Sequence, residues 1–213
     1  MRITIVFDNT SLSEECQAEW GFACYIETEH RRILFDTGAD GKILLDNMRA
    51  LSIDPKSVDD VFISHNHFDH IGGLAAFLNE NSAVRIFLPK SFRGVRKARE
   101  IIYIDEARQI DEGLFTTGEL DGLEQSLVIQ TSKGLVVVVG CAHPDMQKIL
   151  TSASQFGNIY WLIGGLHGFN KFHLLKDLKL ICPTHCTQYN TEIKNLFPLP
   201  HTEGGVGRTI NIP

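Results

Sequence analysis

Four side chains that can bind metal ions lie within six positions of the stretch 62–73: His65, His67, Asp69 and His70. Packing alone does not explain this cluster, because partly buried imidazoles and carboxylates need polar partners. His65 and His67, at the end of an apolar run, can turn their rings to one side and bind one ion. Asp69 and His70 can face a second ion, since a carboxylate oxygen and an imidazole nitrogen together suit zinc, manganese or iron.

Ligand-type side chains also follow other apolar segments of the chain. Six predicted strands end, within a few residues, in an aspartate or a histidine: Asp8, Asp36, His65, His143, His167 and His185. Strand ends can meet at one edge of a sandwich, where loops hold functional groups on a rigid scaffold. The pattern predicts one site built from distant segments, with His30, His173 and His201 left at the surface.

Because zinc requires a known number of ligands, several of these residues can be assigned to one ion or the other. Catalytic zinc takes three protein ligands and keeps one position open. His143 is therefore the predicted third ligand of the first ion, and His185 completes the set of Asp69 and His70. Asp36 is predicted to accept the second ring N–H of a metal-bound histidine and to fix its tautomer. The alternative for Asp36 is an exposed turn residue, because Asp-x-Gly is also ordinary turn chemistry.

We expect two divalent ions, zinc first, with manganese or iron as alternatives. Two ions about 3.5–4 Å apart would share a water, lower its pKa and hold the hydroxide beside a polarised carbonyl or phosphoryl group. Asp69 is the residue expected to be essential for catalysis, and no Ser or Cys has the neighbours typical of a nucleophile. A structural zinc bound by Cys182 and Cys186 is a weaker alternative, since a closed site needs four ligands.

The composition is that of an ordinary globular protein. The chain has 213 residues, 43% hydrophobic residues, a formal charge of −6 and no linker-like tract, so we expect one domain over residues 1–213. The charge does not favour nucleic-acid binding, and the longest apolar run, 135–142, is too short to span a bilayer. A cytoplasmic location follows by default. Five cysteines without a secretion signal favour thiols over disulfides.

Residue periodicity predicts the elements that position the site. Strands are expected at 2–7, 23–27, 33–35, 61–63, 83–88, 127–129, 135–139, 159–163 and 178–181. Helical spacing is present at 43–51, at 74–78, and after Pro144 with Met146, Ile149 and Leu150 inward. Gly72 and Gly73 are expected to let the chain bend tightly before the second of these helices.

A basic stretch interrupts this acidic chain at Lys90, Arg93, Arg96, Lys97 and Arg99. The favoured interpretation is a solvated helix face, because clustered Lys and Arg are common on surface helices. The alternative is a clamp for an anionic substrate.

The His-x-His-x-Asp-His pattern resembles the signature of the metallo-β-lactamase fold superfamily. One branch, named for the 7,8-dihydropterin-6-methyl-4-(β-D-ribofuranosyl)-aminobenzene-5′-phosphate synthases of methanopterin biosynthesis, is similar in further motifs. These are Phe7-Asp8-Asn9-Thr10, Leu34–Gly38, Thr117–Glu119, Glu124–Leu127, Gly140–Pro144, Ile163–His167 and Pro183–Thr187. The resemblance covers nearly the whole chain and implies an αββα sandwich, a four-layer α/β fold, with a binuclear metal site at one edge.

The chain departs from the family in places that concern the site. Many members place a bridging aspartate after the strand that here ends at Gly165, whereas this chain offers His167. His167 is therefore predicted as a metal ligand, with contact to substrate as the alternative. Trp20 stands where the branch suggests a histidine. Asp8 and Asn9, in the first motif, are assigned to substrate binding.

We expect a metal-dependent hydrolase that acts on a small anionic, phosphorylated metabolite. The branch's named activity is the alternative: condensation of a dihydropterin diphosphate with a ribosyl aminobenzene phosphate, with the same metals binding the diphosphate leaving group. A redox role with iron and a non-catalytic metal- or ligand-binding module are further alternatives. Nuclease activity is disfavoured, because the basic arms of the superfamily's processing ribonucleases are missing here.

Overall fold

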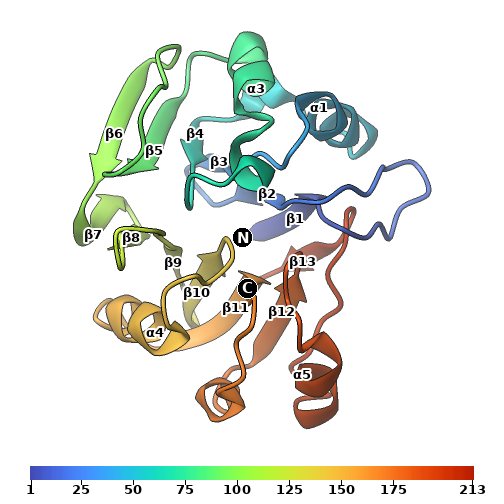
Figure 1. Cartoon of the computed structure of the whole chain (residues 1–213), viewed down its shortest axis with the longest axis vertical. Coiled ribbons are helices and arrows are strands. Elements are labelled where there is room, and N and C mark those ends of the chain that lie inside the picture. Colours follow the sequence, from blue (N-terminus) through green and yellow to red (C-terminus); the bar gives the residue numbers. More distant parts are fainter.

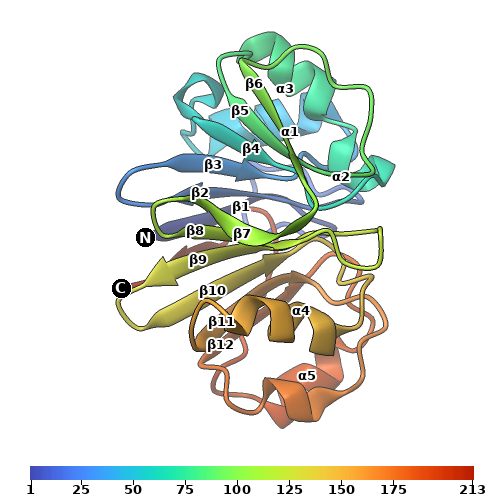
Figure 2. The same ribbon diagram turned by 90° about the vertical axis from the view of Figure 1, so that its left-hand side faces the viewer.

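Two β-sheets lie face to face, and helices cover the outer face of each sheet (Figures 1 and 2). The computed structural model describes all residues 1–213. The chain therefore has the αββα sandwich architecture predicted from its sequence. No helix is both long and apolar enough to cross a bilayer.

The strands occupy the two sheets in an order that differs from their order in the chain. The first sheet contains, from edge to edge, β13 (Thr209–Asn211), β1 (Arg2–Phe7), β2 (Ala23–Glu27), β3 (Arg32–Phe35), β4 (Asp60–Phe62), β5 (Arg85–Pro89) and β6 (Glu100–Ile104). The second contains β12 (Leu180–Thr184), β11 (Ile159–Gly165), β10 (Gly134–Val139), β9 (Leu127–Thr131), β8 (Leu114–Gly118) and β7 (Glu106–Asp111). The helices are α1 (Gly41–Ala50), α2 (Phe68–Ile71), α3 (Leu74–Glu80), α4 (Met146–Ser154) and α5 (Asn190–Leu196), with 3-10 turns η1 (Pro55–Ser57) and η2 (Phe172–Leu175).

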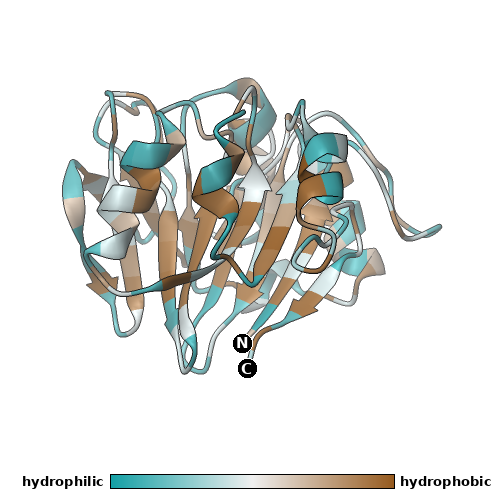
Figure 3. Cartoon of the chain, turned by 90° about the horizontal axis from the view of Figure 1, so that it is seen from below, coloured by the Kyte–Doolittle hydropathy of each residue, from teal (hydrophilic) through white to brown (hydrophobic).

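Strand alternation divides the apolar residues among three cores. In β10, Val136 and Val138 pack between the two sheets, whereas Val137 and Val139 pack on the outer side with Met146 of α4. Successive side chains of a strand point to opposite faces, so a strand covered on both faces is apolar throughout. Figure 3 shows this distribution, with hydrophobic residues along the strands and polar residues on the outer turns of the helices.

Parallel pairing brings the functional loops to one edge of the sandwich. Strands β3, β4 and β5 run parallel, as do β10, β11 and β12, so the loops after them emerge on the same side. Figure 2 shows α2 at this edge and both chain termini at the opposite one. The predicted strand-end residues therefore belong to loops that share one edge of the molecule.

Two local expectations need correction. Residues 90–99 form a loop rather than a helix, because Gly94 adopts a φ of 103°, which is incompatible with a helical path. Gly72 and Gly73 do not supply unusual dihedral angles. They supply space, since a Cβ on Gly72 would lie 2.0 Å from the Ala39 carbonyl oxygen and one on Gly73 would lie 2.2 Å from that of Thr37.

Candidate metal centre

Three imidazole nitrogens converge at the loop that follows β4. His67 Nδ1 lies 3.0 Å from His65 Nε2 and 3.1 Å from His143 Nε2. His143 reaches this point from the loop after β10, in the other sheet. Nitrogens this close are expected when they share one ion, because Zn–N bonds are about 2.0–2.1 Å long. These three residues form the first ligand set.

Asp69, His70 and His185 form the second ligand set, and their ligand atoms lie within 4.8 Å of one another. His185 Nε2 is 3.1 Å from Asp69 Oδ2. The His185 side chain is fully buried, and this nitrogen has no hydrogen-bond partner. A buried polar atom without a partner costs free energy, and a cation beside the Asp69 carboxylate would satisfy it. The donor set therefore fits a divalent metal ion.

Buried oxygens behind the rings determine which nitrogen faces the site. Asp36 Oδ2 lies 2.7 Å from His70 Nδ1 and accepts the Ser64 hydroxyl proton at 2.7 Å. Ser64 Oγ lies 2.9 Å from His65 Nδ1 and, having donated its proton, can only accept there. Each ring therefore presents the lone pair of Nε2 to the site. Asp36 is fully buried, unlike an exposed turn residue.

Asp8 and Asn9 lie behind His185 and hold it in place. Asn9 Oδ1 is 2.9 Å from His185 Nδ1, and the Asn9 amide donates to the His185 carbonyl at 2.9 Å. Asp8 Oδ1 accepts from the His185 backbone N–H at 2.9 Å. Burial raises the pKa of Asp8 to about 6, although backbone N–H groups oppose this. Their predicted contact with a substrate stays a prediction.

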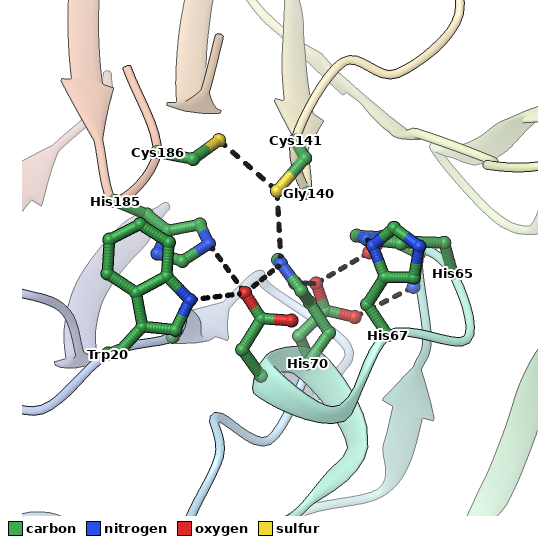
Figure 4. Close-up of polar contacts among 12 residues, drawn as sticks. Trp20, His65, His67, His70, Gly140, Cys141, His185 and Cys186 are labelled. Atoms are coloured by element: carbon green, nitrogen blue, oxygen red, sulfur yellow. Dashed lines mark hydrogen bonds and ion pairs between the residues drawn. The ribbon is translucent and has the colours of Figure 1, made fainter. Parts of the chain in front are cut away.

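Trp20 and His167 lie on either side of the ligand sets. The Trp20 indole N–H donates to Asp69 Oδ2 at 2.9 Å, and its ring meets the His185 ring edge-on (Figure 4). His167, predicted as a metal ligand, belongs to neither set. Its side chain is exposed beside His143, at 5.2 Å between ring centroids, because β11 ends two residues earlier at Gly165.

The charge states of these groups suit a cation. Burial, then the neighbouring histidines, lowers the pKa of His65 and lowers that of His143 to about 4. Burial would raise the pKa of Asp69, but contact with His185 and the nearby His70 lowers it below its ordinary value. Burial would also lower the pKa of His70, yet Asp36 raises it, which makes this ring a stronger base. Neutral imidazoles and an ionised carboxylate are the forms that bind metals.

Comparison with known proteins agrees with this geometry. Residues 21–123 match the family model of the metallo-beta-lactamase superfamily. The structure of Tm1679, a metal-dependent hydrolase of the β-lactamase superfamily, superposes with a TM-score of 0.80 at 25% identity, covering 100% of this chain and 99% of that one. This chain has the metallo-β-lactamase fold.

Two further comparisons are informative. The 7,8-dihydropterin-6-methyl-4-(beta-D-ribofuranosyl)-aminobenzene-5'-phosphate synthase of Methanocaldococcus jannaschii is 29% identical over 91% of this chain and 89% of its own length. The structure of Zn(2+)-bound PqqB from Methylobacterium extorquens has a TM-score of 0.64 at 11% identity, covering all of both chains. That second likeness concerns the fold alone.

Two cysteines lie at the candidate metal site, and the sequence analysis had assigned neither of them to it. Cys141 Sγ lies 3.2 Å from His70 Nε2 and 3.2 Å from Cys186 Sγ (Figure 4). The hydrogen bond between the sulfurs lowers the pKa at which the pair loses its first proton. Cys182 is instead buried between the sheets and belongs to no ligand group. A structural zinc held by Cys182 and Cys186 is therefore wrong.

Glu124 holds the loop after β10, and its role was also not predicted. This fully buried carboxylate accepts four backbone N–H groups at 3.0–3.2 Å, those of Gly140, Cys141, Ala142 and His143. Burial raises the pKa of Glu124, although these donors oppose the rise. The sequence had two signals for it: Glu124 lies close to a predicted buried strand, and it begins one of the motifs shared with the family branch. Glu124 fixes the backbone from which both Cys141 and His143 reach the site.

Proposed function

We propose that this protein is a metal-dependent hydrolase that acts on a small anionic, phosphorylated metabolite. The observation that carries the proposal is the pair of ligand sets that meet at one sheet edge, with the buried His185 Nε2 left without a hydrogen-bond partner. Two divalent ions bound there would polarise a phosphoryl or carbonyl group and lower the pKa of a water. No protein nucleophile is then needed.

The residues of the chain orient the ligand atoms and supply a negative charge. Asp36 and Asn9 fix the tautomers of His70 and His185, so the ligand atoms are in place before a metal or a substrate arrives. Asp69 is held by the Trp20 indole and is ionised, which is the form of a carboxylate that binds a cation.

A groove beside α2 carries basic residues in a mainly apolar lining, and these residues support an anionic substrate. The groove has a volume of about 450 Å³ and lies between α3 and the loop 90–99, and Arg93, Arg96 and Lys97 are among its lining residues. It borders the site through Ile71, the residue after His70. None of the ligand residues lines it, so it would hold a part of the substrate that is remote from the reacting bond. The basic residues of the loop 90–99 would thus act as a clamp for an anionic substrate.

The second candidate is a condensing synthase, and the similarity to the archaeal synthase over 91% of this chain favours it. The same metals would then bind a diphosphate leaving group instead of directing water. Incubation of the metal-loaded protein with a dihydropterin diphosphate and a ribosyl aminobenzene phosphate separates the two candidates. A synthase yields the joined product, and a hydrolase does not.

Replacement of one ligand tests the hydrolase proposal. Asp69→Ala should remove metal and activity together, with turnover falling by at least about 10²-fold because the only carboxylate among the six ligands is lost. Turnover would be measured on phosphoesters, diphosphates and lactones, and metal content by elemental analysis. Asp46→Ala, which changes an exposed carboxylate, serves as the control. A metal-free Asp69→Ala protein with full turnover would contradict the proposal.

A further inference from the structure

The Cys141 sulfur lies between the two ligand sets. Cys141 forms one group of potential ligands with His65 and His70, and another with His185 and Cys186, with ligand atoms within 4.8 Å in each group. His65 belongs to the first ligand set, and His70 and His185 belong to the second. The sulfur of Cys141 is therefore placed to contact ions held by either set.

The backbone around Gly165 leaves room for the Cys141 sulfur between the two ligand sets. A Cβ on Gly165 at the end of β11 would lie 2.4 Å from the Gly140 carbonyl oxygen and 2.8 Å from Cys186 Sγ. A side chain at position 165 therefore cannot enter this space, and Cys141 reaches it from the end of β10. The backbone N–H of Cys141 donates to Glu124. A buried carboxylate thus fixes the backbone that carries this sulfur.

The chemistry of the surroundings favours a thiolate. Cys141 is 3% exposed, and its sulfur has only the weak hydrogen-bonding capacity of a thiol with which to satisfy His70 Nε2. Asp69 is the only anionic group among the six residues of the two ligand sets. Two divalent ions beside one carboxylate keep a charge of about +3, and a thiolate lowers it to about +2. Thiolate sulfur is also a favoured ligand of zinc.

We propose that the Cys141 thiolate is a metal ligand shared by the two ion positions, with Cys186 donating its S–H to that sulfur. Metal binding then releases the thiol proton of Cys141 to solvent, and a metal–sulfur bond forms. This inference rests on the proposed metal-dependent function, and it names a ligand that the histidines and aspartates of the signature do not include.

X-ray absorption at the zinc edge of the zinc-loaded wild-type protein tests the proposal without any substitution. A sulfur neighbour at about 2.3 Å, in addition to nitrogen and oxygen neighbours at about 2.0–2.2 Å, is the expected result. A zinc-loaded protein with nitrogen and oxygen neighbours alone would overturn the thiolate ligand while leaving the metal-dependent hydrolase intact. A protein that binds neither zinc nor cobalt would overturn both.

Cobalt-substituted variants identify which sulfur is the ligand. The wild type should show a near-ultraviolet thiolate-to-cobalt charge-transfer band, and Cys141→Ser should lose it while its metal affinity falls at least about tenfold. Cys186→Ser should keep the band. Cys16→Ser, a change in a half-buried thiol that belongs to no ligand group, should match the wild type. A band that survives in Cys141→Ser, or that is lost only in Cys186→Ser, would contradict the assignment.

Discussion

The two ends of the central strands carry similar polar groups but satisfy them differently. At the end where β4 and β5 begin, Arg85 forms bonds of 2.6 and 2.8 Å to Asp60 and of 2.6 Å to Asp111. Every charge in that cluster has an opposite partner in the protein. At the other end of β4, the facing nitrogens of His65, His67 and His143 meet only one another. One end is complete, and the arrangement at the other fits a cation.

This difference distinguishes a structural charge cluster from a binding site. Both clusters contain buried polar groups, such as Asp60 in one and His65 and His70 in the other, so burial of polar groups does not by itself indicate function. The Arg85 cluster stabilises the fold, because each buried charge is paired. In the histidine cluster, the buried polar groups that face the site lack partners of opposite charge in the protein. A bound cation would supply that partner. Substitutions at the first end should therefore change stability alone, and those at the second should change metal binding.

The largest expected effect is that of Arg85→Ala on stability. The change leaves the buried Asp60 carboxylate with only Arg31, at 3.9 Å, and should lower the free energy of unfolding by about 3–5 kcal/mol. Metal content per folded chain should not change. Denaturant unfolding and elemental analysis measure the two quantities. Loss of metal in a folded Arg85→Ala protein would break the distinction between the two ends.

The matched control and the pH dependence sharpen this prediction. Arg2→Ala removes an exposed pair with Glu27 and should lower the free energy of unfolding by at most about 1 kcal/mol.

Burial would raise the pKa of Asp111, but the hydrogen bond from Arg85 lowers it. The ionised Asp111 carboxylate therefore makes its full contribution to the free energy of unfolding above the unfolded-state pKa of about 3.9. That contribution is lost as the pH falls through the lower pKa of the folded state. The difference between wild type and Arg85→Ala should shrink in acid.

Removal of metal should have the next largest effect. Free metal at a hundredfold excess over its dissociation constant contributes about 2.7 kcal/mol, which corresponds to a melting temperature about 5–11 °C higher than that of chelator-treated protein. The gain should disappear in Asp69→Ala and persist in Arg2→Ala. Equal melting temperatures with and without zinc would show that the histidine end needs no cation.

Asp36→Asn should have a smaller effect, confined to metal binding. The amide keeps the shape of the side chain but removes the charge that accepts from His70 and Ser64. Loss of such a partner typically costs 10–100-fold in metal affinity, which isothermal titration calorimetry would measure. Asp46→Asn is the control, since that carboxylate is exposed. An unchanged affinity would show that Asp36 has no influence on the metal through His70.

Trp20→Phe should have the smallest effect. It removes the indole N–H that bonds to Asp69 and keeps an aromatic ring beside His185. A single net hydrogen bond is worth about 0.5–1.5 kcal/mol, so metal affinity or the substrate KM should change by about two- to tenfold. A larger loss than that of Asp36→Asn would mean that the indole does more than hold a carboxylate.

The sequence predicted the parts of this molecule that depend on local pattern. The uniformly apolar strands β10 and β11 and the ligands that follow strand ends could be recognised because a strand buried on both faces has a distinctive composition. Strands β6, β7 and β8 were missed. β6 and β7 each lie at one edge of a sheet, and most of their residues are exposed or half-buried, so they lack the apolar periodicity that marks a strand. β8 is mostly buried, but its sequence Leu-Phe-Thr-Thr-Gly has only two apolar residues.

The parts of the site that could not be predicted depend on long-range proximity. Cys141 and Cys186 are 45 positions apart, and their sulfurs meet only because β10 and β12 both pair with β11. Trp20 reaches Asp69 from a loop that has no regular pattern. His167 has a ligand-type side chain after a strand but belongs to neither ligand set. Residue type and position suggested candidates, and the tertiary fold decided which of them converge.

The central claim is that two cations occupy the histidine end of the sandwich. Anomalous diffraction at the zinc edge, from crystals of zinc-loaded protein, tests it most directly. The expected result is two peaks, one among the nitrogens of His65, His67 and His143, and one beside Asp69, His70 and His185. Peaks elsewhere on the surface, or none at all, would contradict the account.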